Sequence, residues 1–162
     1  MAVFLSCIIY RMTIRRFRNR DAVAVSELIV ENLKNVNIHD YSDELINALA
    51  TYKTPQQVLD SAGKSDAFVA EENSVILGVV MLKGNEIINM FVHMQAQGKW
   101  VGQALMNCVE NLAKTLYISE LIVYSSITAV EFYKKCGYSL VKKVNKPFRD
   151  IENNVFRMTK TL

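Results

Sequence analysis

The sequence is short of the residues that build metal sites and disulfide frameworks. Its 162 residues include three cysteines, Cys7, Cys108 and Cys136, and two histidines, His39 and His93. An odd number of cysteines without paired spacing argues against a disulfide scaffold and favours a reducing compartment, so we expect a cytoplasmic protein. With two histidines and no Cys-x-x-Cys pair, the sequence predicts no metal site.

Strong charge and long apolar runs are also missing. A net charge of +3 falls well short of the concentrated basic surface that general nucleic-acid binding needs, so we expect no nucleic-acid partner. The opening apolar run, residues 2–10, has no basic residue before it and is too short to span a bilayer. We therefore expect no membrane partner. The sequence leaves open whether this run pairs as an extra strand or covers an apolar face.

Carboxylates are absent from the stretch between Glu86 and Glu110. An apolar strand is predicted at residues 87–92, and Gln97-Gly98-Lys99-Trp100-Val101-Gly102 then leads into a helix with one apolar face. A glycine-bearing turn and a helix N-terminus present unpaired N–H groups and the positive end of the helix dipole. This stretch is therefore predicted to bind an anion such as a phosphate.

The spacing of apolar residues predicts an α/β order of elements in a chain of about one domain. Strands are predicted at residues 13–17, 67–70, 75–82, 87–92, 121–124, 138–144 and 155–161. Helices are predicted at residues 22–36, 41–52, 101–116 and 128–136, and Thr54-Pro55-Gln56-Gln57 predicts the capped start of a further short helix. The second, third and fourth strands are expected to form an antiparallel meander.

A second segment, Ala129-Val130-Glu131-Phe132-Tyr133-Lys134-Lys135-Cys136-Gly137-Tyr138, predicts a short helix, a glycine stop and an aromatic strand start. In this order, the two segments resemble the GNAT superfamily of N-acetyltransferases. The first family motif is Gln or Arg, two residues, Gly, one residue, then Gly or Ala; Gln97 and Gly102 match it and Trp100 departs from it. The second motif, Ala-x-x-Phe-Tyr-x-x-x-Gly-Phe/Tyr, is matched at every named position.

The resemblance covers residues 12–162 and implies a single N-acetyltransferase domain, with residues 1–11 as an N-terminal apolar extension. The implied fold is α/β (α+β), of GNAT type: a central mixed, mostly antiparallel twisted sheet of about seven strands flanked by helices on both faces. In that fold the fourth and fifth strands diverge and leave unpaired backbone between them, which needs a hydrogen-bonding partner.

By the same resemblance, the co-substrate is acetyl-CoA, without a metal. Its phosphates would bind the loop residues, its pantetheine arm would lie along the fourth strand, and the Ser126 hydroxyl would donate one bond, although capping of the helix near Thr128 explains Ser126 equally well. The implied cofactor-binding residues are Met90, Phe91, Val92, Gln97, Gly98, Lys99, Trp100, Val101, Gly102, Gln103, Ser126 and Tyr133.

Tyr133 is the expected catalytic acid, because a phenol with a pKa of about 10 is protonated at neutral pH and can protonate the departing thiolate. The alternative is that it only packs beside Phe132. Glu86, or a water held by Asn89, is expected to take the amine proton, although an acid at the edge of a strand is often only solvated. A main-chain N–H near Met90 would meet the oxyanion.

Trp100 stands where the family usually has glycine. A left-handed backbone there would cost tryptophan roughly 1–2 kcal/mol. We expect instead an ordinary backbone angle, with the indole pointing away or lying over the cofactor, and a change in affinity rather than loss of binding.

The function that follows is direct transfer of an acetyl group, in a ternary complex, from acetyl-CoA to a primary amine of an unidentified small-molecule or peptide acceptor. No histidine partners Cys136 in the sequence, which argues against an acetyl-cysteine intermediate. The cluster His39, Asp40, Tyr41, Asp43 and Glu44 would suit a cationic amine, but acids at a helix start also complement the helix dipole.

Two alternatives stay open. One is a non-catalytic module that binds or senses acyl-CoA, suggested by Trp100 and the lack of an obvious base. The other is an interaction protein in which residues 2–10 dock a partner or a second copy, so a homodimer is also open.

Overall fold

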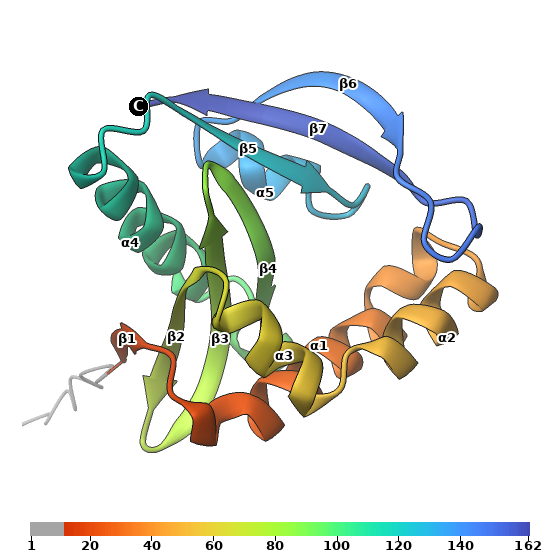
Figure 1. The fold of residues 1–162 in the computed structure, drawn as a ribbon, viewed down its shortest axis with the longest axis horizontal. Coiled ribbons are helices and arrows are strands. Elements are labelled where there is room, and N and C mark those ends of the chain that lie inside the picture. The colour runs from red at the N-terminus through yellow and green to blue at the C-terminus, as the bar shows by residue number, and fades with distance from the viewer. Residues whose placement is uncertain (1–11) are drawn as a thin grey trace, which may run out of the picture.

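A computed structural model describes residues 12–162, and the apolar extension lies outside the described residues. Within that range, seven strands form one open mixed sheet in the order β1-β2-β3-β4-β5-β7-β6 (Figure 1). The strands are β1 (Thr13–Arg16), β2 (Asp66–Glu72), β3 (Val75–Lys83), β4 (Glu86–Val92), β5 (Glu120–Ser125), β6 (Ser139–Asn145) and β7 (Asn154–Thr161). Only β4 and β5 pair in parallel among these strands. The expected fold class is confirmed.

Helices cover both faces of the sheet (Figure 1). They are α1 (Ala22–Asn35), α2 (Asp43–Tyr52), α3 (Pro55–Ala62), α4 (Val101–Thr115) and α5 (Val130–Lys135), with short 3-10 turns η1 (Asn19–Asp21), η2 (Asn37–His39) and η3 (Met94–Ala96). Side chains of strand β3 pack on both faces of the sheet. Its Val79 and Met81 pack with α1, whereas Val80 and Leu82 pack with α4, as the alternation of a strand requires.

Local sequence signals explain where the helices begin. The Thr54 hydroxyl accepts a hydrogen bond from the Gln57 N–H at 3.2 Å, and Pro55 is the first residue of α3, so the predicted cap is confirmed. Ser42 caps α2 in the same way, through the N–H of Leu45 at 3.2 Å.

Strands β4 and β5 separate soon after they meet. Their parallel pairing is confined to Glu86 with Ile122 and Ile87 with Val123. Figure 1 shows β5 running away from β4 beyond that point. Asn89 has a left-handed backbone, with φ of 49°, where the register against β3 shifts, so β4 carries a bulge that the sequence analysis did not predict. The expected divergence of these strands is confirmed.

A mostly buried ion pair fixes β7 against the helices on one face. The Lys160 ammonium lies 2.7 Å from the Glu110 carboxylate on α4 and 2.7 Å from the Cys136 carbonyl at the end of α5. Glu110 has 8% of its side chain exposed, so the pair holds α4 and the end of α5 in register with the sheet.

Gly78 allows α4 to lie close to the sheet. A Cβ at this position would lie 2.8 Å from Leu105 Cδ1 and 3.0 Å from the carbonyl oxygen of Phe91. The second atom belongs to the backbone of β4 and cannot rotate away, so any side chain at residue 78 would push β3 away from α4 or β4.

We predict that Gly78→Ala lowers the free energy of unfolding by about 1–3 kcal/mol, as overpacking of a core does. Urea denaturation followed by circular dichroism measures the change. Gly63→Ala is the matched control, because its Cβ would meet nothing closer than the Leu59 carbonyl oxygen at 3.4 Å. Equal stabilities for the two variants would contradict the close approach at Gly78.

Candidate active site

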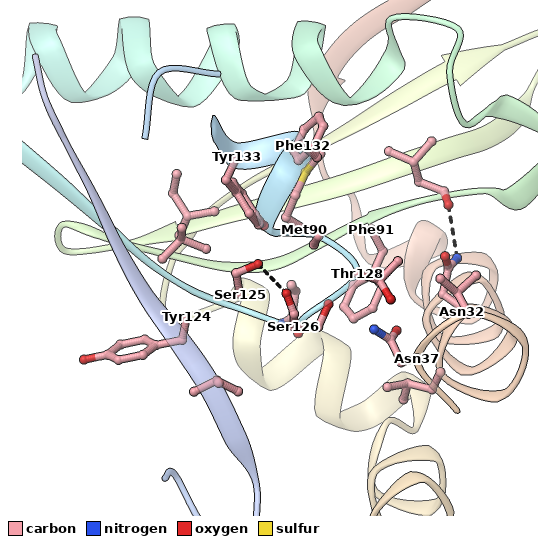
Figure 2. A pocket seen from close by; sticks show the side chains of 18 of the residues that line it. Asn32, Asn37, Met90, Phe91, Tyr124, Ser125, Ser126, Thr128, Phe132 and Tyr133 are labelled. Atoms are coloured by element: carbon pink, nitrogen blue, oxygen red, sulfur yellow. Dashed lines mark hydrogen bonds between the residues drawn. The ribbon is translucent and has the colours of Figure 1, made fainter. Parts of the chain in front are cut away.

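The gap between β4 and β5 opens into a cavity of about 560 Å³. Its walls come from α1, α2, β4, the end of β5 and α5. Figure 2 shows Tyr133 and Phe132 reaching it from α5, and Asn32 and Asn37 from the side of α1. The two helical layers thus face one another across the same cavity.

Most of the candidate site residues line this cavity: Glu86, Met90, Phe91, Val92, Gln97, Gly98, Gly102, Ser126 and Tyr133. Four residues at the loop and the start of α4 do not: Lys99, Trp100, Val101 and Gln103. Val101 is buried in the core, and the Gln103 amide bonds to Asn107 on the same helix. The structure therefore brings the strand and part of the loop together and turns the side chains of those four residues elsewhere.

The unpaired edge of β4 follows from its hydrogen bonds to β3. The His93 N–H bonds to the Leu77 carbonyl on β3 at 2.8 Å. Because main-chain groups alternate along a strand, those of Val92 and Met90 face the opposite way, toward the gap. The main chain of residues 90 and 92 is thus available on the cavity side.

A network of two side-chain amides, from buried Asn32 and exposed Gln97, occupies part of that edge. Asn32, 4% exposed on α1, donates to the Val92 carbonyl at 3.1 Å, and its own Oδ1 accepts from Gln97 at 3.1 Å. Gln97 also lies 3.2 Å from the Val92 carbonyl. The Gln97 side chain therefore ties the loop to β4 and α1. Sequence reasoning missed Asn32. Its place on the apolar stripe of α1, between Ile29 and Leu33, indicates a buried amide that needs hydrogen-bond partners.

The loop before α4 turns sharply at two residues. Gly98 has φ of 74° and Trp100 has φ of 65°, both left-handed. The expectation of an ordinary backbone at Trp100 is therefore wrong: Trp100 is the N-cap of α4, and this tight turn into the helix imposes the left-handed angle. The indole is 81% exposed and does not line the cavity.

The start of α4 has the features of an anion site. Trp100 provides no side-chain hydrogen bond to the first turn of the helix, so the N–H groups of that turn find no cap within the described chain. They carry the positive end of the dipole of a 15-residue helix. The residues fit a phosphate-bearing ligand.

Tyr133 both packs in the core and faces the cavity. It is 5% exposed and meets Phe132 and Tyr138 edge to face, with ring centroids 5.1 and 5.9 Å apart. Burial raises the pKa of its phenol above the usual value, so it stays protonated at neutral pH. Within residues 12–162 its hydroxyl forms no hydrogen bond, and Tyr133 lines the cavity.

Glu86 lies where β4 and β5 are still paired. One of its carboxylate oxygens is 3.7 Å from the Lys146 ammonium, and its side chain is 38% exposed. The bulge at Asn89 is three residues further along the strand. Glu86 therefore reaches the cavity wall with a cationic partner beside it.

The acidic cluster before α2 does not form a pocket wall. Asp40 accepts hydrogen bonds from the Thr128 N–H at 2.9 Å and the Thr128 hydroxyl at 2.7 Å, which links the α1–α2 connection to the β5–α5 turn. Of the five clustered residues, Tyr41 alone lines the cavity, and burial together with Asp40 raises its pKa to about 12.

Ser126 does not cap the helix that follows it. The N-cap of α5 is Ala129, and no side chain caps the first turn, so the capping explanation for Ser126 is wrong.

Lys53 is a cavity residue that sequence reasoning missed. It follows α2 directly, and its ammonium donates to the Asn89 side-chain oxygen at the bulge, at 2.7 Å. Burial lowers its pKa to about 8. A lysine at the end of a helix usually complements the helix dipole, so its position in the sequence did not indicate a site.

The described part of the chain, residues 12–162, contains neither a membrane-spanning helix nor a cluster of metal-binding side chains. None of the helices there is long and apolar enough to cross a membrane. No group of three or more His, Cys, Asp or Glu side chains in that range is arranged to hold a metal ion.

The mixed sheet splays beside the N-terminus of α4, and buried Tyr133 lies across the gap. The chain belongs to the GNAT acetyltransferase family, whose domain model matches residues 37–162. It is 27% identical over 154 residues to an uncharacterized N-acetyltransferase of Methanocaldococcus jannaschii, with 92% of each chain covered.

Solved structures of N-acetyltransferases share this fold. A GCN5-related N-acetyltransferase from Rhodopseudomonas palustris, also described as a class-II aminotransferase, is 26% identical with a TM-score of 0.87, over 93% of this chain and 95% of that one. The PaiA N-acetyltransferase from Thermoplasma acidophilum, solved with coenzyme A, is 19% identical with a TM-score of 0.77, over 93% and 99% of the two chains. The protein is thus an acyltransferase.

We predict that Trp100→Gly raises the free energy of unfolding relative to Trp100→Ala by about 1 kcal/mol, because glycine adopts the left-handed angle without a Cβ clash. The alanine variant is the control, since both changes remove the same exposed indole. Thermal and urea unfolding of the two variants measure the difference. If the alanine variant proves the more stable, residue 100 is not left-handed in solution.

Proposed function

We propose that the protein transfers an acetyl group from acetyl-CoA directly to a primary amine of a small-molecule or peptide acceptor. The observation that carries the proposal is one cavity that combines the unpaired edge of β4, the uncapped start of α4 and the buried phenol of Tyr133. Each supplies one requirement of acyl transfer: a track for the carrier, an anion site and a proton donor.

The phosphates of coenzyme A are assigned to the start of α4 and the turn before it, at Gln97, Gly98, Lys99, Trp100, Val101, Gly102 and Gln103. The uncapped main-chain N–H groups in the first turn of α4 carry this role, because the N–H groups of Gln97 and Lys99 already bond to the carbonyls of Met94 and Ala96. The absence of carboxylates between Glu86 and Glu110 supports the assignment. So does the similar fold of the PaiA enzyme, which was solved with coenzyme A.

The pantetheine arm is assigned to residues 90–92, where the main chain of Met90 and Val92 faces the gap. The Val92 carbonyl already accepts from Asn32 and Gln97, so a ligand amide there would share or displace one of these donors. The Met90 N–H is assigned to the carbonyl oxygen that becomes negatively charged during transfer.

The reaction forms a nitrogen–carbon bond and breaks a carbon–sulfur bond. Acetyl-CoA, when bound, supplies the thioester carbonyl and the thiolate leaving group. Tyr133 gives its proton to that thiolate, and burial raises the pKa of its phenol, so the phenol is protonated at neutral pH. Glu86 is assigned the amine proton, through water, because Asn89 is already hydrogen-bonded to Lys53 and Met81.

A module that senses acyl-CoA without turnover is the second candidate. Its support is Trp100, an exposed tryptophan beside the proposed phosphate site. The acid role of Tyr133 separates the two candidates, because a sensor needs no proton donor.

Coenzyme A is expected to bind and to raise the melting temperature, because a ligand that binds only the folded state stabilises it. Isothermal titration calorimetry and thermal unfolding at modest salt measure both. No heat and no stabilisation at millimolar excess would contradict the enzyme and the sensor alike.

Tyr133→Phe is expected to lower kcat for thiol release by about 10²-fold or more, because it removes the proton donor and keeps the ring. Binding of coenzyme A should stay within a few-fold of the original. Tyr117→Phe is the control, because Tyr117 is 95% exposed after α4. An unchanged kcat in Tyr133→Phe would show that Tyr133 only packs.

A further inference from the structure

The charged lining of the cavity suggests which amines it accepts. Among residues 12–162, two charged side chains line it, Glu86 and Lys53. Glu86 has Lys146 beside it at 3.7 Å. Lys53 forms no ion pair within the described chain, and residues 1–11 contain no acid.

Lys53 is held firmly at its backbone. Its N–H bonds to the Leu49 carbonyl at 3.0 Å, and its carbonyl accepts from the Ser26 hydroxyl at 2.6 Å. From the end of α2 the side chain reaches β4, where Nζ lies 2.7 Å from Asn89 Oδ1. Asn89 in turn donates to Met81 Sδ at 3.4 Å, so the ammonium is anchored at the bulge.

The ammonium lies on the side of the sheet away from Tyr133. Met81, which contacts Asn89, packs in the α1-side core, whereas Met90 and Tyr133 belong to the α4-side core. The proposed thiol end of the carrier is on the Tyr133 side. Lys53 therefore faces the space that remains for the acceptor.

The Lys53 ammonium has no carboxylate beside it within residues 12–162. It has three N–H donors, and Asn89 takes one of them. A cation removed from water without a carboxylate beside it is unfavourable, and a carboxylate that entered the cavity would restore the missing interaction. A polycationic amine would meet repulsion at the same place.

We propose that Lys53 binds a carboxylate of the acceptor, and that the acceptor is an amino acid with this carboxylate next to its amine. Lys53 is anchored at Asn89, and the next residue, Met90, is assigned to the thioester oxygen, so we place the carboxylate and the reacting amine on one small acceptor. The inference rests on the proposed function. It also accounts for the acids Asp40, Asp43 and Glu44 lying outside the cavity, since a zwitterion needs no acidic wall.

The test is a thiol-release assay with acetyl-CoA and L-amino acids, each paired with its amide and its decarboxylated amine, plus spermidine and an aminoglycoside. The acids should exceed their amides in kcat/KM by about 10- to 100-fold, the range of a charge-assisted hydrogen bond. Lys53→Met should bring the ratio near one, mainly through KM. Lys53→Arg should keep most of it, and Lys64→Met, at an exposed lysine beyond α3, should match the original protein.

Calorimetry of an amino acid with the coenzyme-A-loaded protein tests carboxylate binding at Lys53 separately from acetyl transfer. If coenzyme A binds but no amine releases thiol, the proposed transfer is wrong. Amino-acid binding that Lys53→Met abolishes would still support the role of Lys53. Equal rates for acids and amides, a preference for spermidine, or no amino-acid binding overturns it. Mass spectrometry that finds an acetyl group on Lys53 also overturns it, because Lys53 would then be an acceptor.

Discussion

The structure depends on the early loss of pairing between β4 and β5. Two residue pairs join these strands, and beyond them the main chain of β4 faces a cavity instead of a neighbour. Unpaired backbone groups need partners. One of them, the Val92 carbonyl, accepts from Asn32 and Gln97, and the main chain at Met90 faces the cavity. The start of α4 and the phenol of Tyr133 lie beside this edge, so all three features border one cavity.

The bulge at Asn89 separates an apolar part of the cavity from a part that contains the Lys53 ammonium. After the bulge, Met90 and Val92 pack with the α4-side core, where Tyr133 lies. At the bulge, Asn89 turns toward α2 and holds Lys53. Tyr133 and Met90 therefore lie on one side of the sheet at this cavity, and the Lys53 ammonium lies on the other.

The order of elements, the caps and the core faces were predictable from the sequence, because periodicity and capping are local signals, as at Thr54 and along α4. The loop residues and Tyr133 were predicted as site residues through motifs, and their roles stay predictions. Contacts between distant residues were not predictable: Asp40 meets Thr128 across 88 positions, and Lys53 meets Asn89 across 36. Trp100 was misjudged because its φ is set by how the turn enters α4, which residue type alone does not report.

With so short a ladder between β4 and β5, the two parts of the sheet are joined mainly by side chains. Leu121 and Val123 of β5 share one apolar cluster with Val80 and Leu82 of β3, over the helix residues Leu105 and Val109. Hydrogen-bonded strands must stay about 4.8 Å apart, whereas apolar attraction has no preferred direction. A joint made of such contacts tolerates a wider spacing than a ladder does, so the sheet stays intact although β4 and β5 separate in its middle.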